Sequence, residues 1–484
     1  MIVMKFGGTS VRDREAVARL TGIVRRGHER TLSERGPDGS GPVVVVSALA
    51  GVTDRLLEVA MLARDGRRDE AERALDDLRV RHLEMVGLIR DGERRHALLA
   101  TVDAQLGELT SLAQAVGVLG ELSSRSQDAM AAIGELMSSA IVAAALADAG
   151  LDAVWIDARD VVVTTADHTE ARPLLDETGT RVERRLRPLL AGAVPVLGGY
   201  IGATVSGATT TLGRGGSDYS AAILGACLGA DEIQIWTDVD GMLTADPRVV
   251  ADTQVVAELS FDEASELAYF GAKVLHPSTI LPAVARGVPV RILNSHRPEA
   301  GGTRIDARVA PERGPLAAIA CKRGVTRIDI TSTRMLMAYG FLRRAFEVFE
   351  RFRTPVDVVT TSEVSVSVTI DDTRRLEQIL DALSAFAEVT CERDRAIVCA
   401  VGEGLHDDPA LGARAIGALQ GVPLEMVSQG GSRKNVTVVV PDAAVAEAMH
   451  RLHDHFFGAS DAEPVGAAAT ASLVSAPSGG TIPS

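Results

Sequence analysis

A glycine-rich segment with both signs of charge is the stretch of this chain best suited to chemistry. Residues 209–222 read TTTLGRGGSDYSAA and place Arg214 and Asp218 four positions apart, among closely spaced glycines. A strand that ends in such a turn and continues as a helix directs backbone N–H groups and the positive end of the helix dipole at a phosphate. Glycine costs conformational order wherever it is not needed, so a phosphate site is favoured over the alternative, a purely structural turn.

Lys5 lies in a second segment of this kind, KFGGTS, between a strand-like run and a helical pattern. A lysine ammonium at a strand end, beside Gly7 and Gly8, is suited to holding the oxygens of a transferring phosphate. A surface lysine before an ordinary turn would give the same local pattern. The strand end and the two neighbouring glycines favour a phosphate-binding role for Lys5 over a surface lysine.

Three other polar residues follow or interrupt apolar sequence. Ser47 and Thr53 come after the buried run VVVV, where the carboxyl edge of an α/β sheet binds ligands. Capping of the next helix by Thr53 or Asp54 is an equally good explanation. Glu135 follows Gly134, and we expect this pair to open a helix, where a glutamate complements the helix dipole. If Glu135 lies in a cleft instead, it could hold a substrate ammonium.

Two later segments fit nucleotide recognition. Thr237 and Asp238 end a strand, and Arg248 follows in the sequence DPR, which suits ribose and phosphate but is also a common helix start. Lys273 lies in FGAKVLHP, which we expect to be a loop entering the same site, with His276 in a structural role. The Walker A, HRD, DFG, HExxH and GxSxG motifs are absent, so any phosphate chemistry belongs to another class.

Composition limits the remaining possibilities. The chain has 484 residues, which predicts two or three domains, with 46% hydrophobic and 24% charged residues. Aromatic residues are only 3% and the net charge is −15, which argues against nucleic acid or an anionic membrane as partner. The four cysteines form no metal-binding or CxxC pattern. No apolar run is expected to approach the roughly 20 residues of a membrane span, and we expect a cytoplasmic enzyme or sensor.

Short β-branched runs alternate with helical periodicity up to about residue 305. This alternation predicts an α/β domain with a largely parallel, buried sheet. The stretches 31–42 and 69–119 are expected to be surface elaborations, and residues 201–212 a hairpin. The expected strands are Ile2–Phe6, Val43–Val46, Ala153–Ile156, Val194–Leu197, Glu232–Trp236 and Val288–Ile292.

The C-terminal third contains an internal repeat. Residues 306–315 carry two prolines among charged residues and are the expected domain boundary. Beyond them, alternating strands begin near Pro355 and again near Pro423, 68 positions later, each preceded by an amphipathic helix at 341–352 or 411–420. Two related α+β modules explain this pattern. The Ala/Ser/Gly/Pro-rich stretch 459–484 is expected to be disordered.

Taken together, these segments resemble the aspartate kinases of the amino-acid kinase family. The matching stretches, in the family's order, are KFGGTSV, VVVSALAGVTD, GELMSS, TTTLGRGGSDYSAA, WTDVDGMLTADPR and FGAKVLHP. The repeat resembles the paired ACT modules of such enzymes through MLMAYGFL, VDVVTTSEVSVSVT and SQGGSRKNVTVVV. The resemblance implies an α/β amino-acid kinase fold at 1–309, a mostly parallel sheet sandwiched by helices. It places two ferredoxin-like ACT modules at 316–388 and 389–458, and leaves 459–484 outside.

The resemblance also implies a reaction and a set of site residues. Such enzymes transfer the γ-phosphoryl group of MgATP to the side-chain carboxylate of L-aspartate, giving 4-phospho-L-aspartate, without a phosphoenzyme; this is the first step of aspartate-family amino-acid biosynthesis. Lys5 and Asp218 are the implied catalytic residues. Mg²⁺ would bridge the ATP phosphates with little protein ligation, so no protein metal site is expected. The implied aspartate-binding residues are Ser47, Thr53, Glu135, Arg214 and Ser217. The implied ATP-binding residues are Lys5, Gly7, Gly8, Thr237, Asp238, Arg248, Lys273 and Val274.

ACT pairs of this family commonly sense lysine at an interface between two chains. The matching residues here are Met335, Phe341, Leu342 and Asp357, with Asp357 suited to an effector ammonium. Ala338 and Pro355 replace polar side chains of some lysine-sensing relatives, although YGFL matches another lysine-sensing branch. We expect lysine inhibition and a homodimer or larger homo-oligomer. Leu243 stands where relatives often have tyrosine, which is expected to affect ATP affinity more than chemistry.

Two other functions stay open at this point. One is phosphorylation of glutamate or a related acid, which a substrate panel would distinguish. The other is a catalytically silent ACT sensor that keeps a kinase-like domain for assembly. Retention of Lys5, Glu135, Arg214 and Asp218 together argues against the silent sensor.

Overall fold

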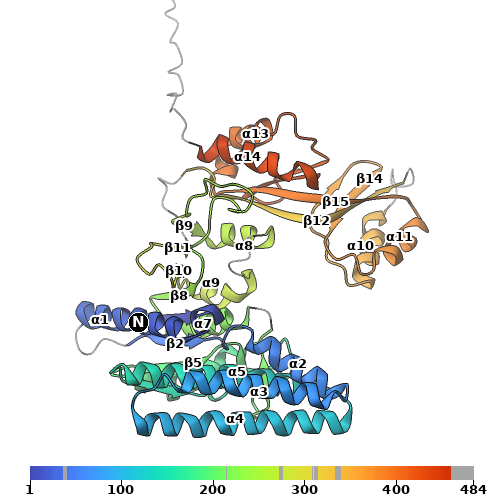
Figure 1. Cartoon of the computed structure of the whole chain (residues 1–484). Coiled ribbons are helices and arrows are strands. Elements are labelled where there is room, and N and C mark those ends of the chain that lie inside the picture. The colour runs from blue at the N-terminus through green and yellow to red at the C-terminus, as the bar shows by residue number, and fades with distance from the viewer. Residues whose placement is uncertain are drawn as a thin grey trace, which may run out of the picture.

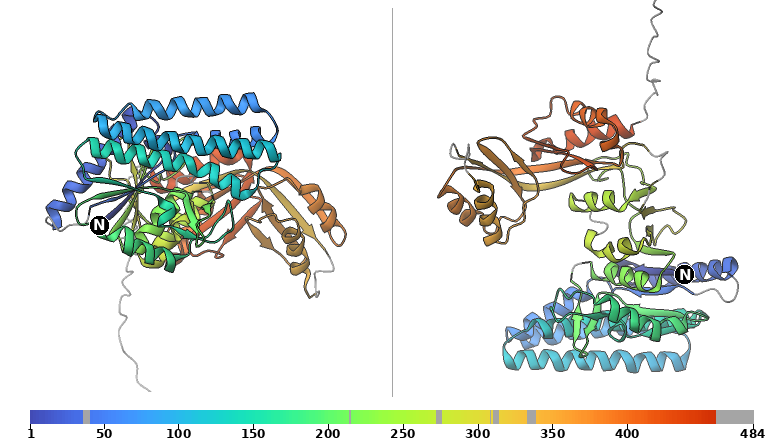
Figure 2. Two further views of the ribbon diagram at one scale, coloured as in Figure 1. Left: turned by 90° about the horizontal axis from the view of Figure 1, so that it is seen from below. Right: turned by 180° about the vertical axis from the view of Figure 1, so that it is seen from behind.

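The computed structural model describes residues 1–35, 41–213, 215–271, 276–307, 309, 314–332 and 339–458. A layered N-terminal part is built on one sheet, and a second sheet with its own helices lies at the far end of the molecule (Figures 1 and 2). The stretch 459–484, expected to be disordered, lies outside the described residues.

The first sheet has eight strands in the order β3-β5-β2-β1-β8-β10-β11-β9, parallel except between β10 and β11. Helices cover both faces, so β2 can consist of four valines that are all buried. The expected strands are confirmed, with the last one shifted by two residues. The bounds are β1 (Ile2–Phe6), β2 (Val43–Val46), β3 (Ala153–Ile156), β5 (Val194–Gly198), β8 (Glu232–Thr237), β9 (Glu258–Ser260), β10 (Val290–Asn294) and β11 (Thr303–Asp306).

A small sheet lies beside this one. It joins β4 (Val163–Thr164), β6 (Ile201–Thr204) and β7 (Thr209–Thr211). Strands β6 and β7 pair antiparallel across Ser206 and Gly207, so the expected hairpin is confirmed. The hairpin leads directly into the glycine-rich turn.

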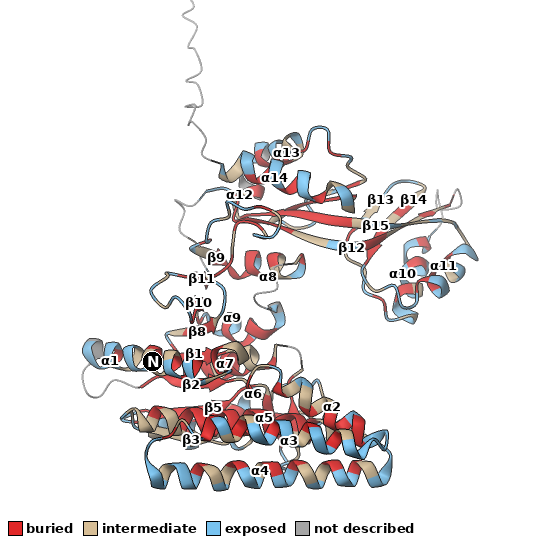
Figure 3. Ribbon diagram, in the orientation of Figure 1, coloured by how far each residue is buried: buried red, intermediate tan, exposed pale blue. Residues whose placement is uncertain are grey.

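Helices α1 (Arg14–Arg35), α2 (Val52–Arg64) and α5 (Ser124–Asp148) share a core with one face of the sheet. Helices α3 (Arg68–Val86) and α4 (Gly92–Leu119) pack on α2 and α5 and bury Leu78, Val102 and Leu106 (Figure 3). The expectation that residues 69–119 are a surface elaboration is therefore wrong, because they form an outer helical layer with its own buried side. The other face carries α6 (Leu175–Arg185), α7 (Gly216–Leu228), α8 (Phe261–Tyr269) and α9 (Leu281–Arg286).

Helix α5 has the length and composition of a membrane-spanning helix, contrary to our expectation that no segment approaches this. However, 83% of its most apolar window is buried inside the protein. It packs against α2, α4, β3 and β5. These contacts make α5 a core helix of the first sheet.

The second sheet is antiparallel, with the order β13-β14-β12-β15-β17-β16. Its central strands β12 (Ala318–Thr331) and β15 (Glu388–Val401) each have 14 residues and run through both halves of the sheet. The repeat units thus share one sheet, and the expected boundary at 388/389 falls at the start of β15; the domain limits stay predictions. The other elements are α10 (Phe341–Arg351), β13 (Val359–Thr361), β14 (Ser365–Ile370), α11 (Leu376–Ser384), α12 (Gly404–Asp407), α13 (Pro409–Ala418), β16 (Met426–Gln429), β17 (Asn435–Pro441) and α14 (Val445–Phe457).

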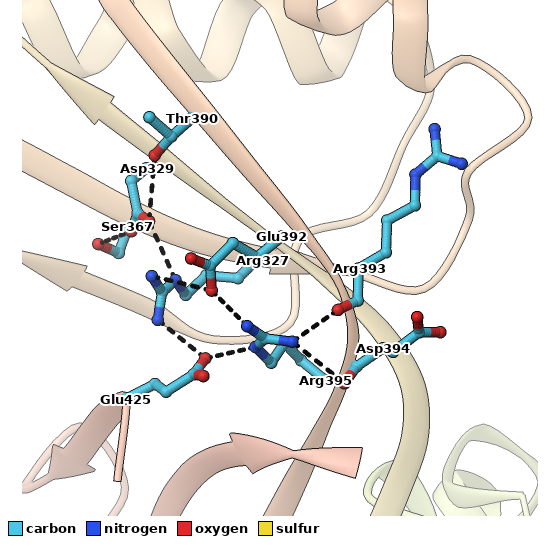
Figure 4. A network of polar contacts seen from close by, with 9 residues as sticks. All are labelled: Arg327, Asp329, Ser367, Thr390, Glu392, Arg393, Asp394, Arg395 and Glu425. Carbon is cyan, nitrogen blue, oxygen red and sulfur yellow. Dashed lines mark hydrogen bonds and ion pairs between the residues drawn. The ribbon is translucent and has the colours of Figure 1, made fainter. Parts of the chain in front are cut away.

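A network of ion pairs fixes the place where the two halves meet (Figure 4). Glu425, just before β16, accepts from Arg327 of β12 at 2.8 Å and from Arg395 of β15 at 2.7 Å. Arg395 also pairs with Glu392 at 2.5 Å, and Arg327 with Asp329 at 3.0 Å. Several of these side chains are largely buried, so the network resists screening by salt better than isolated surface pairs.

Candidate active site

Lys5 and Asp218 form the centre of the site. Lys5 is the penultimate residue of strand β1, and its Nζ lies 2.7 Å from Oδ1 of Asp218 in the first turn of α7. Their side chains are 11% and 15% exposed, so the pair is largely shielded yet reachable. A lysine ammonium here, near the start of α7, is a fixed positive charge suited to phosphate oxygens. The structure thus brings the two implied catalytic residues together.

The glycine-rich turn has the backbone conformation that its sequence predicts. Gly213 and Gly215 have φ angles of 75° and 71°, which favour glycine, and Gly215 is the N-cap residue of α7. A Cβ atom at Gly216 would lie 2.5 Å from the Tyr200 ring, so this glycine permits close packing of α7. Arg214, between them, lies outside the described residues.

Two glycines lie near Lys5, and space is tight at Gly8 but not at Gly7. A Cβ atom at Gly7 would lie 3.5 Å from Lys5 Nζ, an ordinary contact, whereas one at Gly8 would lie 3.1 Å from the Ala48 carbonyl oxygen. The short helix Gly8–Ser10 is tied to the segment after β10 because Ser10 Oγ lies 3.0 Å from Ser295 Oγ. The lack of a side chain at Gly7 leaves the place next to the Lys5 ammonium free of a Cβ atom.

A group of hydroxyl and carboxylate side chains borders the other side of Asp218. Ser47 donates to Ser217 Oγ at 2.9 Å, and Ser138 donates to the Ser47 carbonyl at 2.7 Å. The backbone N–H of Ala48 donates to Glu135 Oε1 at 3.3 Å. Three segments distant in sequence thus converge, and they include the implied residues Ser47, Glu135 and Ser217.

Glu135 is buried in the middle of α5, not in the first turn of a helix, so dipole complementation is wrong as its explanation. Its Oε2 is buried without a hydrogen-bond partner among the described residues. Burial raises the pKa of Glu135 to about 8. A buried carboxylate with a free oxygen beside a ligand site is suited to a cationic group.

Thr53 is the second residue of α2 and is half-buried. Helix capping does not explain it, since Gly51 occupies the N-cap position of α2 and no side-chain capping bond is present there. Its place near the carboxyl end of β2 agrees with the sequence prediction, and its role as a ligand contact stays a prediction.

A cavity of about 330 Å³ follows the end of β8. Thr237, Asp238 and Arg248 line it, together with Leu243. Arg248 forms a two-point ion pair with Asp246 at 2.6 and 3.0 Å, and 83% of its side chain is exposed. The volume is at the lower end of ligand pockets, and the wall at Leu243 is aliphatic. Lys273 and Val274 lie outside the described residues.

The second sheet closes one side of this cavity. Ile319, Ala320 and Cys321 of β12 contribute to its wall. Gly271 packs so closely that a Cβ atom there would lie 2.2 Å from the Cys321 carbonyl oxygen. The sequence gives no local signal for these wall residues, because Ile319 follows Gly271, the last of the cavity's other residues, by 48 positions.

The implied effector residues differ in how far they are buried. Phe341 is buried at the start of α10 and packs edge-on against Phe386, whereas Leu342 is exposed. Asp357 is buried and accepts from Lys322 Nζ at 2.7 Å and from Tyr269 Oη at 3.0 Å. Burial raises the pKa of Asp357, against the effect of Lys322. Met335 and Ala338 lie outside the described residues.

Sequence reasoning missed Tyr200 and Ser138. Tyr200 has φ 65°, rare for a non-glycine residue, and its pKa is raised by burial and further by the carboxylates of Glu135 and Asp128. No sequence pattern indicates this conformation. Ser138 lies three residues after Glu135 within the matching stretch GELMSS, so its helical spacing from that glutamate and this motif were its signals.

Other candidate sites are less suited to catalysis. A hollow of about 640 Å³ is lined mainly by charged side chains of 157–160 and α6, and none of the candidate site residues lines it. Within the described ranges, no three His, Cys, Asp or Glu side chains are grouped to hold a metal ion.

Comparison with known proteins agrees with this architecture. The Amino acid kinase family pattern matches residues 1–294, and an ACT domain pattern matches 398–456. The chain belongs to the amino acid kinase family. Within that family its relatives are aspartokinases.

Two of these relatives are similar over nearly the whole chain. Aspartokinase 3, chloroplastic, of Arabidopsis thaliana is 38% identical over 96% of this chain and 83% of its own length. Lysine-sensitive aspartokinase 3 of Escherichia coli is 35% identical over 94% and 99%.

A solved structure of E. coli aspartokinase III with aspartate and ADP (R-state) has a TM-score of 0.78 and 34% identity, covering 94% of this chain and 100% of that one. The same enzyme with lysine and aspartate (T-state) has a TM-score of 0.79 and 35% identity, covering 94% and 99%. Both similarities extend over the first sheet and the second.

Proposed function

We propose that this chain transfers the γ-phosphoryl group of ATP to the side-chain carboxylate of L-aspartate. The observation that carries the proposal is the convergence of the shielded Lys5–Asp218 pair with the buried, partly unpartnered carboxylate of Glu135. The Lys5–Asp218 pair is suited to an anionic phosphate, and the Glu135 carboxylate is suited to the ammonium group of an amino acid. Similarity to aspartokinases along almost the full length supports the same conclusion.

In this proposal the acceptor is held at both of its main-chain charges. Glu135 takes the α-ammonium, and Arg214 takes the α-carboxylate through two parallel hydrogen bonds. Ser47, Thr53 and Ser217 add hydrogen bonds. The acceptor's side-chain carboxylate then points toward the Lys5–Asp218 pair, ready for in-line attack on the phosphorus.

The phosphate end is stabilised by charge. Lys5 neutralises negative charge on the transferring group, and Asp218 orients the Lys5 ammonium through its 2.7 Å contact. Gly7 and Gly8 leave space for the phosphates, and the cavity after β8 takes the nucleoside.

Mg²⁺ is part of the proposal as a partner of the nucleotide. A magnesium ion usually keeps several waters and binds through the phosphates with one or two carboxylates. When bound, Mg²⁺ would supply additional positive charge to the phosphates.

The direct test is ADP release with MgATP and either L-aspartate or L-glutamate. We expect turnover that depends on aspartate, with little on glutamate. Turnover on glutamate alone would assign another amino-acid kinase activity. No turnover on either acid would favour the silent sensor.

Replacement of Arg214 by lysine is expected to raise the KM for aspartate by at least tenfold, with a smaller change in the KM for ATP. Lysine keeps the charge but cannot reproduce a planar two-point contact with a carboxylate. Steady-state kinetics with each substrate varied in turn would measure this. A selective rise in the KM for ATP would mean that the substrate and nucleotide sides are assigned the wrong way round.

We also propose that lysine inhibits the enzyme through the second sheet, by favouring a conformation with weaker substrate binding. Asp357 would contribute to binding the effector's ammonium, which competes with Lys322 for the same carboxylate. We expect Asp357→Asn to raise the lysine concentration for half-inhibition at least tenfold. Asp371→Asn is the matched control, because Asp371 also contacts Lys322 at 2.7 Å but is 43% exposed. Equal lysine sensitivity in both variants and the wild type would exclude this role.

We also propose an oligomeric state and a cellular compartment for this chain. A homodimer or larger homo-oligomer is proposed because the second sheet matches an ACT domain, and most soluble oligomers are symmetric homo-oligomers. All four cysteines are free, which fits a reducing, cytoplasmic compartment.

A further inference from the structure

Asp128 is a buried carboxylate that the proposed reaction does not use. It lies on α5, seven residues before Glu135, and is 1% exposed. Seven residues are about two helical turns, so both carboxylates lie on the same side of α5. A fully buried charge requires several donors to be tolerated.

Three donors from outside α5 meet this carboxylate. Thr211 Oγ1 donates to Oδ1 at 2.6 Å, and the backbone N–H of Thr169 lies 3.1 Å from both oxygens. His168 Nδ1 lies 2.7 Å from Oδ2. One side chain therefore joins α5, the segment between β4 and α6, and the end of β7.

The contacted segments border the glycine-rich turn. Thr169 has φ 75°, a conformation that non-glycine residues rarely adopt, and its N–H, which donates to both oxygens of Asp128, holds it there. The Thr169 carbonyl oxygen faces Gly213, where a Cβ atom would lie 3.3 Å from it. Ala171 N–H donates to the Thr211 carbonyl at 2.9 Å. The first residues of the turn thus rest on a support fixed by Asp128.

We propose that Asp128 is a positioning residue for the amino-acid acceptor, acting by fixing the start of the turn that carries Arg214. This inference rests on the proposed function, in which Arg214 binds the acceptor's α-carboxylate. The far end of the turn is held separately, by Ser47 on Ser217 and by Lys5 on Asp218. Loosening the start should therefore displace the acceptor contact more than the phosphate contact.

The test compares three variants of the full-length protein. Asp128→Asn keeps the side-chain size but replaces one acceptor oxygen by an NH₂ group, and Thr211→Val removes one donor. Thr210→Val is the matched control, because the Thr210 hydroxyl is also buried but lies 2.6 Å from Thr164 Oγ1, away from Asp128. For each variant, both KM values, kcat and the melting temperature are measured, together with aspartate binding by calorimetry.

We expect the KM and Kd for aspartate to rise about tenfold or more in Asp128→Asn and in Thr211→Val, with the KM for ATP within twofold. Thr210→Val should keep both KM values. Parallel changes in the two KM values, or the same aspartate KM in Thr210→Val and Thr211→Val, would overturn the inference. If Asp128→Asn does not fold, Thr211→Val against Thr210→Val decides alone. Wild-type protein without aspartate-dependent turnover would instead contradict the proposed function.

Discussion

Lys5→Ala is expected to lower kcat by about 10²- to 10³-fold, the typical effect of removing one charge-stabilising donor from a transition state. Negative charge develops on the oxygens around the transferring phosphorus during the reaction. The Lys5 ammonium can stabilise this charge because it is held beside Asp218 in a shielded position. The KM values should change much less than kcat. Initial rates of ADP release at saturating ATP and aspartate provide the measurement.

A matched control separates catalysis from stability. Lys434, just before β17, forms an ion pair with Glu403, just after β15, so Lys434→Ala breaks a lysine–carboxylate contact of the same kind away from Lys5. This variant should keep kcat within about twofold. If Lys5→Ala retains nearly full kcat, Lys5 is a structural residue, and the catalytic assignment fails.

Glu135→Gln is expected to weaken aspartate binding by about 100-fold and to abolish its pH dependence. Glu135 has a pKa of about 8 in the unliganded protein, so it is mostly protonated at pH 7. An ammonium bound beside it would favour the ionised form, and aspartate binding should therefore release up to about one proton. Below pH 8, aspartate affinity should rise about tenfold per pH unit. Glutamine cannot supply the charge.

Calorimetry of aspartate binding in buffers of different ionisation enthalpy measures the released proton directly. Proton release by the wild type but not by Glu135→Gln would support the assignment. An unchanged aspartate Kd in Glu135→Gln would exclude contact between Glu135 and the substrate ammonium.

The raised pKa of Glu135 also predicts how the free energy of unfolding depends on pH. Its pKa is raised above the usual 4.5, so the folded protein holds this proton more tightly than the unfolded chain. The free energy of unfolding therefore decreases as pH rises from about 4.5 to about 8, by at most a few kcal/mol from this group. Glu135→Gln should be more stable than the wild type at pH 8, where the wild type buries a charge.

The sequence predicted most of the first sheet because its strands are continuous apolar runs between clear helical patterns, as in β1 and β2. It misplaced the helix around Glu135 because Gly134 suggested a helix start. In the structure this glycine lies mid-helix, where a Cβ atom would lie 3.0 Å from both Ala48 Cβ and Leu56 Cδ1. The glycine serves close packing of α5, which depends on partners distant in sequence.

The candidate site was predictable where chemistry depends on residue type and spacing, as at Lys5 and Asp218. It was not predictable where a side chain acts through tertiary neighbours. Asp128 has no local motif, and its importance follows only from the three segments that meet it. The contribution of β12 to the nucleotide cavity is similarly non-local.

Strand β12 connects the cavity that we propose for the nucleotide with the carboxylate that we propose for the effector. Ile319–Cys321 line the cavity, Lys322 pairs with Asp357, and Arg327 belongs to the junction network six residues after Cys321. With these proposed assignments, substitutions in β12 that relieve lysine inhibition should also change ATP affinity. Deleting the second sheet would remove one wall of the cavity, so we expect the first sheet and its helices alone to bind ATP more weakly.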